Sequence, residues 1–137
     1  MEQKLRQIIR QILLKEYMTQ RDLDSIEDYA DDLFSDVDVD VEFSSHFLDN
    51  ANNPRNKEDI TPEELMTLFD KTHNKYGNHI SHLKSGSEIV FNDTKSDINM
   101  PTGINKIDKS NKREMKPISV MRKKDYKPFS NSPKLRV

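Results

Sequence analysis

Apolar residues recur at helical spacing at the very start of the chain. The spacing predicts a short amphipathic helix within residues 1–18, with basic residues between the apolar ones. A single helix of this kind leaves its apolar stripe uncovered, so we interpret it as a surface for a partner helix. The stripe consists of Leu5, Ile8, Ile9, Ile12 and Leu13.

A second helix is predicted from about Arg21 to Phe34, and its polar positions are almost all Asp or Glu. The expected inward positions are Ile26, Tyr29, Ala30 and Leu33. The two predicted helices can form a hairpin that packs either on the rest of the chain or on a partner.

Strict alternation follows between residues 36 and 43. Valine and phenylalanine occupy one face and carboxylates the other, which predicts a half-buried strand. A row of carboxylates also raises the possibility of calcium binding. Carboxylates on one strand face diverge, however, whereas a calcium loop needs convergent ligands and a glycine turn. The pattern therefore favours a solvated strand face.

The next segment has clear start and stop signals for helices. A short helix is predicted from about His46 to Asn52, followed by a turn with Asn and Pro. Thr61 and Glu64 form a capping box around Pro62, so a longer helix begins there. We expect Leu65, Leu68, Phe69, Thr72 and Tyr76 to form its buried stripe and Gly77 to end it.

The last third of the chain predicts strands. Residues 87–91 and, more weakly, 98–100 have strand character, and residues 104–107 and 115–121 flank a polar turn as a hairpin. Pro117 cannot donate to a ladder, so we expect its strand either to lie at an edge or to start late. Residues 123–137 read as an extended basic tail.

Composition limits the size of the folded core. Hydrophobic residues make up only 33% of the 137 residues and charged residues 34%, so we expect a core of about 80–90 residues with extensions. There are no cysteines, which excludes disulfides and cysteine-ligated metals. No apolar run is long enough for a membrane span. We expect an amphipathic and acidic helical arm at 1–35, an α+β domain at 36–122 and a basic tail at 123–137.

Charge is segregated along the chain although the net charge is only −2. Residues 19–42 hold ten acidic residues and one basic residue, whereas residues 104–137 hold eleven basic and three acidic residues. Such asymmetry predicts an acidic face and a basic face. The basic end could meet nucleic acid or the chain's own acidic segment. Its best candidates for binding nucleic acid or a partner are Arg122, Lys123, Lys124, Tyr126 and Lys127.

Two further residues are candidates for chemistry. His46, at the start of the short helix, could be a general acid or base, or a structural residue. Arg55 could bind phosphate or pair with a nearby carboxylate. His79 and His82 have a spacing that suits zinc, but no third or fourth ligand is evident, so we expect no metal and no cofactor.

The order of these residues resembles known proteins at two levels. His46, Arg55 and the Ile60–Glu64 opening are similar to RelE/ParE-type toxins, which include RNA-cleaving and ribosome-directed proteins. Over about residues 43–137 the chain more closely resembles a group of proteins from marine and cyanobacterial myophages. The shared blocks are residues 46–49, 53–56, 75–77, 97–101 and 120–124.

The resemblance implies an α+β fold in which N-terminal helices precede a small antiparallel sheet of three or four strands. It implies a phage virion-associated or accessory interaction protein without catalysis, located in the virion or the host cytoplasm. Other virion proteins, RNA or DNA are the implied partners, and an oligomer is possible. Asn50 stands where the group's pattern has an arginine, and RNA cleavage relies on such cations. The alternative is a phage-encoded ribonuclease or translation-directed toxin, packaged in the head if Leu14-Lys15-Glu16 ends a head-targeting segment.

Overall fold

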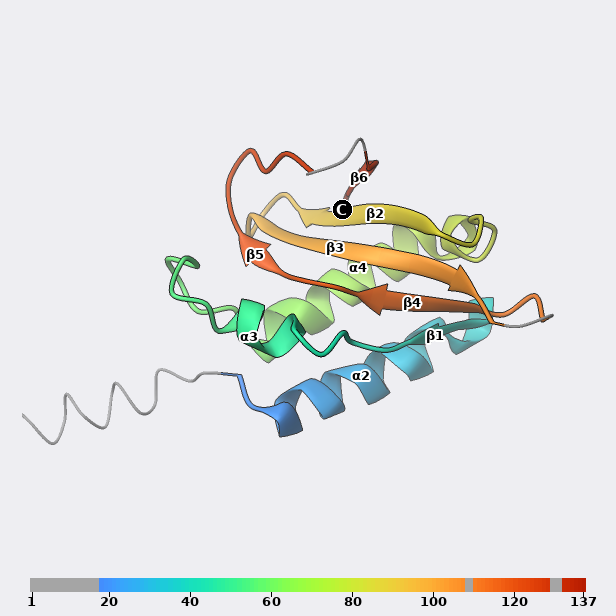
Figure 1. The fold of residues 1–137 in the computed structure, drawn as a ribbon, viewed down its shortest axis with the longest axis horizontal. Helices are drawn as coiled ribbons and strands as arrows, with labels where there is room; N and C mark the ends of the chain where they lie inside the picture. The colour runs from blue at the N-terminus through green and yellow to red at the C-terminus, as the bar shows by residue number, and fades with distance from the viewer. Residues whose placement is uncertain (1–17, 108–109, 129–131) are drawn as a thin grey trace, which may run out of the picture.

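The computed structural model describes residues 18–107, 110–128 and 132–137. Two long helices, α2 (Gln20–Phe34) and α4 (Pro62–Ile80), pack against each other and against a mixed sheet. Figure 1 shows α4 crossing behind the strands and α2 running beside β1 (Val39–Val41). The α+β class is therefore confirmed. Residues 1–17, and with them the predicted partner helix, lie outside the described residues.

The sheet runs β1, β4, β3, β2, β6 in spatial order, and a short β5 also pairs with β3. The remaining strands are β2 (Ser87–Asp93), β3 (Ile98–Lys106), β4 (Arg113–Pro117), β5 (Met121–Arg122) and β6 (Lys134–Arg136). The central pairs β2–β3 and β3–β4 are antiparallel, whereas β1 pairs with β4 and β6 pairs with β2 in parallel.

The predicted small antiparallel sheet is wrong in both size and direction. Strands distant in sequence add to each side of the central β2–β3–β4 meander, and both additions are parallel. Alternation within a segment identifies a strand but carries no information about which neighbour it pairs with or in which direction. The parallel additions therefore could not be read from the local pattern.

Both long helices begin with capping boxes. The Thr61 hydroxyl accepts from the Glu64 amide at 3.2 Å while Glu64 Oε1 accepts from the Thr61 amide at 3.1 Å, as predicted. Thr19 and Asp22 form the same reciprocal pair at the start of α2. These bonds satisfy amides that the first helical turn cannot bond itself.

The expected end of α4 at Gly77 is wrong, because the helix continues to Ile80. Gly77 is buried within the helix, and a Cβ there would lie 3.4 Å from His73 Cδ2 and 3.8 Å from a methyl of Val37. Gly77 thus lies where α4 packs against Val37 and does not end the helix. The short helix predicted after His46 is present as α3 (Phe47–Ala51).

The buried side of α2 differs slightly from the prediction. Leu23, Ile26, Ala30 and Phe34 are buried, whereas Tyr29 is 38% exposed and donates its hydroxyl to Asp70 of α4. The apolar body and polar tip of tyrosine suit this position at the rim of the interface between α2 and α4. The spacing predicted that Tyr29 faces the core, and this prediction is wrong.

The strand predicted over residues 36–43 is shorter in the structure. Residues Ser35–Val37 form a turn of 3-10 helix, and Asp38 has a left-handed backbone with φ of 58°. This turn redirects the chain from α2 into β1, where Val39 and Val41 are buried as the alternation predicted. A short polar side chain such as aspartate tolerates the left-handed conformation better than valine does.

The two strands predicted around Pro101 are one continuous strand, β3, and Pro101 pairs with Val90 within it. Pro117 ends β4, but this strand is not at an edge, since β1 and β3 lie on either side of it. The chain continues beyond Pro117 to β5, and the amide of Ile118 donates to the Pro101 carbonyl at 2.8 Å. The edge position inferred from Pro117 is therefore wrong.

Helix side chains bond the backbone at both edges of the sheet. On the outer side of β1, the Val41 amide donates to Asp31 Oδ1 at 2.6 Å and the Phe43 amide to Glu27 Oε1 at 3.0 Å. On β6, the Arg136 carbonyl accepts from Lys75 Nζ at 2.8 Å and from the Tyr76 hydroxyl at 3.1 Å. The paired groups come from α2 at one edge and from α4 at the other.

One hydrophobic core joins the helices and the sheet. It includes residues of α2, α3, α4 and strands β1 to β4, with Leu135 of β6 packed against it. Phe34, Phe43, Phe47 and Phe69 form a run of ring contacts at its centre, with centroid separations of 4.5 to 6.4 Å. Residues of α2 and Leu135 of β6 thus contact the same core as the strands between them. Among the described helices, none is long and apolar enough to cross a membrane.

Candidate functional site

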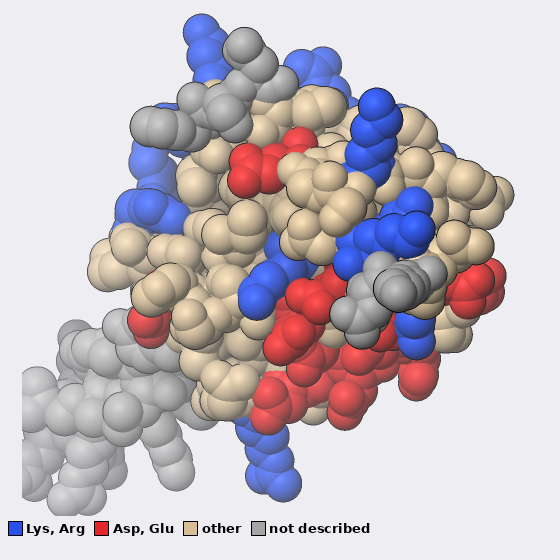
Figure 2. Space-filling view, turned by 45° about the vertical axis from the view of Figure 1, so that its right-hand side comes forward, with Lys and Arg blue, Asp and Glu red and all other residues tan. Residues whose placement is uncertain are grey.

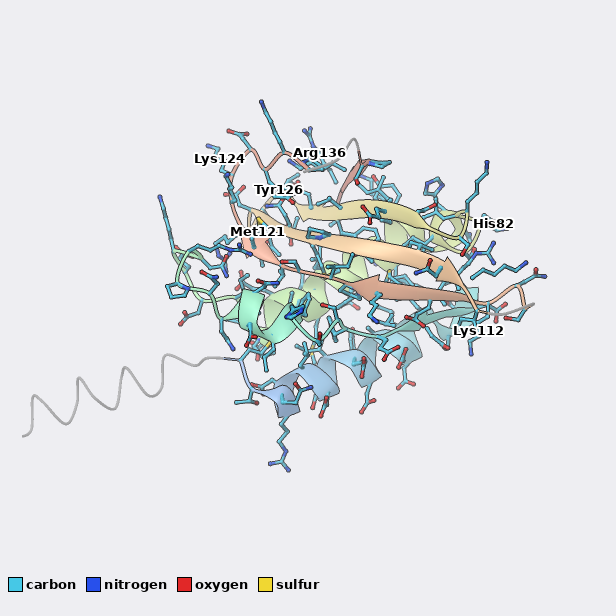
Figure 3. All side chains as sticks on the ribbon, in the orientation of Figure 1. His82, Lys112, Met121, Lys124, Tyr126 and Arg136 are labelled. Atoms are coloured by element: carbon cyan, nitrogen blue, oxygen red, sulfur yellow. The ribbon has the colours of Figure 1, made fainter. Side chains whose placement is uncertain are left out.

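A cleft of about 1300 Å³ opens beside the N-terminal half of α4. One side is the loop between α3 and α4, and the other is the turn between β2 and β3 together with β5 and the residues that follow it. Figure 3 shows Met121 and Lys124 at this end of the sheet, with His82 and Lys112 at the opposite end. The cleft is lined by Arg55, Lys57, Glu58, Glu63, Glu64, Thr67, Lys71, Asp93, Lys95, Ser96, Asp97, Met121, Arg122, Lys123 and Lys124.

Arg122 lies at the floor of the cleft, which we define as the segment 120–124 and the residues bonded to it. Its guanidinium donates to Glu64 Oε1 at 2.7 Å, to the Ser96 carbonyl at 2.8 Å and to the Asp59 carbonyl at 2.9 Å. Only 13% of the Arg122 side chain is exposed. Arg122 therefore links three segments of the chain, and its charge is opposed by Glu64.

The environment of Glu64 favours its charged form. Burial by itself raises the pKa of Glu64, but the hydrogen bonds from Arg122 and Thr61 outweigh it and hold the pKa below the usual value. In return, the hydrogen bond to Glu64 raises the pKa of Arg122 despite its partial burial. Glu64 and Arg122 thus form a permanent ion pair at neutral pH.

Two buried asparagines fix the segment that carries Arg122. Asn56 Oδ1 accepts from the Arg122 amide at 2.9 Å, while its Nδ2 donates to the carbonyls of Asn50 and Ala51. Asn99 Nδ2 donates to the Lys123 carbonyl at 2.9 Å, and Asn99 Oδ1 accepts from Asn92. Blocks 53–56, 97–101 and 120–124 therefore meet in one hydrogen-bond network, although they are distant in sequence.

Lys71 forms the second ion pair of the cleft. Its Nζ lies 3.2 Å from both carboxylate oxygens of Asp93, a side chain that is only 5% exposed. Asp93 Oδ1 also accepts from the Lys95 amide at 3.0 Å. Asp93 therefore neutralises Lys71 and shapes the start of the turn between β2 and β3 at the same time.

The remaining cations of the cleft are free of internal ion pairs. Within the described part of the chain, Arg55, Lys57, Lys95, Lys123 and Lys124 have no carboxylate within ion-pair distance. All five are exposed. Three lining carboxylates of the described residues also have no ion pair, namely Glu58, Glu63 and Asp97, so the unpaired charge of the cleft is positive by five to three. Such an excess of positive charge attracts anionic ligands. None of the described residues that line it is aromatic.

The members of the predicted basic cluster, residues 122–124, 126 and 127, differ in their exposure. Arg122 faces inward, whereas Lys123, Lys124 and Lys127 are exposed. Tyr126 is half-buried, and its carbonyl accepts from Lys134 Nζ at 3.0 Å. Only the lysines of the cluster offer free positive charge.

The two predicted catalytic residues are not brought together in the cleft. Arg55 lines it, but His46 does not. His46 is exposed at the start of α3 and makes no side-chain capping bond. A general base must lie within hydrogen-bond reach of the group it deprotonates. The cleft therefore contains one member of the proposed pair.

No group of three or more His, Cys, Asp or Glu residues that could hold a metal ion is found in the described part of the chain. His82 Nδ1 lies 2.7 Å from the Asn78 carbonyl and His79 lies near Tyr76, so both histidines contact their own helix or its end. His79 and His82 accordingly gain no zinc ligands from elsewhere among these residues.

A second group of acidic residues, separate from those that line the cleft, gathers on α2. Figure 2 shows carboxylates forming a patch low on the visible face, where α2 lies in Figure 1. The outer face of α2 carries Asp24, Asp28 and Asp32, all exposed. A smaller hollow of about 250 Å³ lies beside it and is lined partly by Glu27 and Glu42. The acidic segment of the sequence thus forms an acidic face on α2, whereas the cleft contains residues of both charges.

The sequence pattern missed several residues of the cleft. Lys71 and Thr67 lie on the polar side of α4, Asp93 and Lys95 flank a turn, and Ser96 has no motif around it. One signal in the sequence lies near them, since polar residues follow the strand predicted at residues 87–91. Their convergence depends on long-range packing, which local patterns do not encode.

No family model, curated protein or solved structure was found to match this chain.

Proposed function

We propose that the protein is a non-enzymatic, nucleic-acid-binding accessory or virion-associated protein of a bacteriophage, and that the cleft holds the nucleic acid. The observation that carries the binding proposal is the charge of the cleft. Lys71 and Arg122 are neutralised by carboxylates, whereas five exposed cations, Lys123 and Lys124 among them, outnumber the three lining carboxylates that have no ion pair among the described residues. Phosphates are the anions that such lysines and arginines bind in linear arrays.

The phage context and the virion or host-cytoplasm location come from the sequence blocks alone. The blocks support the proposal because residues 53–56, 97–101 and 120–124 build the floor of the cleft rather than scattered surface. The RelE/ParE likeness belongs to the same proposal, although the parallel outer strands depart from the layout that it implies. Other virion proteins remain proposed partners of the apolar stripe that begins at Leu5.

The binding proposal predicts a steep dependence on salt. Fluorescence anisotropy with labelled DNA and RNA of roughly 20 nucleotides should give affinities that fall sharply between about 50 and 200 mM salt, because bound phosphates release counterions. Replacing Lys123 and Lys124 by Glu should weaken binding about tenfold or more. It should also reduce the slope of log affinity against log salt by about 2.

A matched control is available at the far end of the sheet. Lys84 and Lys106 are exposed near the start of β2 and the end of β3, away from the cleft. Replacing both by Glu makes the same change in net charge and should leave affinity within about twofold of the wild type. Equal losses in the two double variants, or binding that salt does not weaken, would contradict the proposal.

A ribonuclease or translation-directed toxin is the second candidate, and the position of Arg55 on the cleft rim favours it. Incubation of RNA with the wild type and with His46→Ala separates the two functions. Cleavage by the wild type that the variant lacks would establish the ribonuclease. Binding without cleavage supports the accessory protein.

A further inference from the structure

The turn between β2 and β3 forms one wall of the cleft and is bonded from within. The Asp97 amide donates to the Asp93 carbonyl at 2.9 Å, and the Lys95 amide donates to Asp93 Oδ1 at 3.0 Å. Asp97 adopts a left-handed backbone with φ of 60° that closes the turn. Asp93 thus bonds both halves of the turn.

The same turn is also bonded from across the cleft floor. Arg122 Nη1 donates to the Ser96 carbonyl at 2.8 Å, and the Lys123 amide donates to the Asp97 carbonyl at 2.9 Å. Arg122 is itself held by Glu64 and Asn56. Bonds from several elements therefore fix the position of Ser96, and a ligand group placed there would meet a preorganised wall.

One atom of this wall takes no part in the network. In residues 18–107, 110–128 and 132–137, Ser96 Oγ is the single buried side-chain nitrogen or oxygen atom with no hydrogen-bond partner. Nearly all buried polar groups in proteins are hydrogen-bonded, so an exception calls for an explanation. Ser96 as a residue is half-buried and lines the cleft. No bond within the described protein holds the hydroxyl, so a ligand oxygen in the cleft would compete with no internal partner for it.

The surroundings of Ser96 define the chemistry of a ligand. Lys95 precedes it, and the cleft also presents Lys123 and the side chain of Lys71, which is 36% exposed and paired with Asp93. A hydroxyl donor among cations complements an anionic oxygen that accepts hydrogen bonds. The absence of aromatic residues among the described lining side chains removes the platforms on which bases stack.

We propose that Ser96 is the hydrogen-bond donor of a phosphate seat in this cleft, and that the seat takes a phosphodiester group of a nucleic-acid backbone irrespective of the base. The inference rests on the proposed function and makes it more specific. It assigns the contact with the phosphate to the Ser96 hydroxyl, and it implies that the cleft binds nucleic acid without regard to base sequence. Arg122 acts as a positioning residue, since it holds the Ser96 carbonyl.

Replacement of Ser96 by Ala tests the seat. Affinity for labelled oligo(dT) and oligo(dA) should fall roughly three- to tenfold, as expected for one lost hydrogen bond to a ligand. The melting temperature should stay equal to that of the wild type or rise, because the lost hydroxyl has no partner in the free protein. Thr94→Ala is the matched control: Thr94 lies in the same turn, makes only a 3.4 Å bond to the Val137 carbonyl, and does not line the cleft.

Inorganic phosphate distinguishes a backbone phosphate from a free one. In nuclear magnetic resonance titrations of the wild type, phosphate alone should shift the Ser96 amide weakly, whereas oligo(dT) should shift it at far lower concentration. Tight binding of phosphate with no tighter binding of oligo(dT) would overturn the assignment to a backbone. Equal affinity for an oligonucleotide with a neutral methylphosphonate backbone would also overturn it.

The seat and the proposed function fail in different ways. Unchanged affinity in Ser96→Ala, with weakened binding in the Lys123 and Lys124 double variant, would remove the seat and leave the nucleic-acid-binding function standing. Absence of binding by the wild type would remove both. A marked preference for oligo(dT) over oligo(dA), or a lower melting temperature in Ser96→Ala than in Thr94→Ala, would also contradict the seat.

Discussion

Arg122 donates hydrogen bonds to three backbone carbonyls and a carboxylate that belong to three separate segments. In the sequence it is one of several cations at the basic end, and its neighbours Lys123 and Lys124 share that composition. Burial distinguishes them, because a guanidinium can satisfy several acceptors in one plane whereas an ammonium on a flexible chain stays hydrated. The structure thus separates the positioning arginine from the lysines that are free to meet a ligand.

Removal of the Arg122 side chain should destabilise the fold. Arg122→Ala leaves Glu64 and the carbonyls of Glu58, Asp59 and Ser96 without this donor. We expect the free energy of unfolding to fall by about 2 kcal/mol, less than for a fully buried pair because Glu64 is partly exposed. Urea denaturation measures the change. Arg55→Ala, at an exposed arginine of the same cleft, should change stability by less than about 0.5 kcal/mol.

The loss of stability in Arg122→Ala should depend on pH, because it involves the ionised form of Glu64. The folded-state pKa of Glu64 is lower than its usual value of 4.5. Its contribution to stability is therefore present above that value and is lost as the pH falls through the lower folded-state pKa. The stability gap between wild type and Arg122→Ala should narrow on acidification, and a gap that widens would contradict the role given to the pair.

At the scale of elements, Gly77 offers a direct test of the helix assignment. The helix runs through Gly77 to Ile80, and an added Cβ would make ordinary contacts with His73 and Val37. Gly77→Ala should raise the free energy of unfolding by about 0.5–1 kcal/mol through helix propensity and a less flexible unfolded chain. Thermal unfolding followed by circular dichroism measures the gain, and a loss of stability would show that the contact with His73 is too close.

Local chemistry made some elements predictable. Thr61, Pro62 and Glu64 bond their own helix, so their signal lies within four residues and α4 begins where it was expected. The length of β1 was not predictable, because the turn at Asp38 redirects the chain before the alternating pattern ends. The continuous strand through Pro101 was missed because a proline normally marks the edge of a sheet or the end of a strand.

The candidate site was predictable only where charge marked it. Lys123 and Lys124 stand out in a basic segment, but Asp93 and Ser96 acquire a role only when the turn between β2 and β3 meets β5 across the sheet. Such convergence is set by strand pairing between residues more than 20 positions apart. A single sequence contains no local record of it.

At the scale of the whole molecule, the acidic face of α2 crowds like charges. Burial, together with neighbouring carboxylates, raises the pKa of Asp31 although the Val41 amide opposes the shift. Asp31→Asn keeps an oxygen to accept that hydrogen bond and removes the charge. We expect a gain of about 0.3–0.5 kcal/mol at neutral pH, comparable with relief of one like-charge pair on a helix.

The contribution of Asp31 to stability changes with pH in the opposite direction to that of Glu64, because the pKa of Asp31 is raised and that of Glu64 is lowered. Ionised Asp31 lowers stability at neutral pH because its folded-state pKa is raised, and this penalty disappears as the pH falls through that pKa. The advantage of Asp31→Asn should therefore be greatest at neutral pH and vanish near the ordinary aspartate pKa of 3.8. Asp32→Asn, at an exposed position on the same helix, should show a smaller gain in the same denaturation series.

The hydrogen bonds from the helices to the outer strands affect how copies of the protein can associate at high concentration. An exposed strand edge is a template on which another chain can add a strand, and this is a route to aggregation and amyloid. Here the Val41 and Phe43 amides on one side and the Arg136 carbonyl on the other already have partners. Many copies could thus be concentrated in a confined space without merging into a continuous sheet, and any assembly they form would use side-chain surfaces instead.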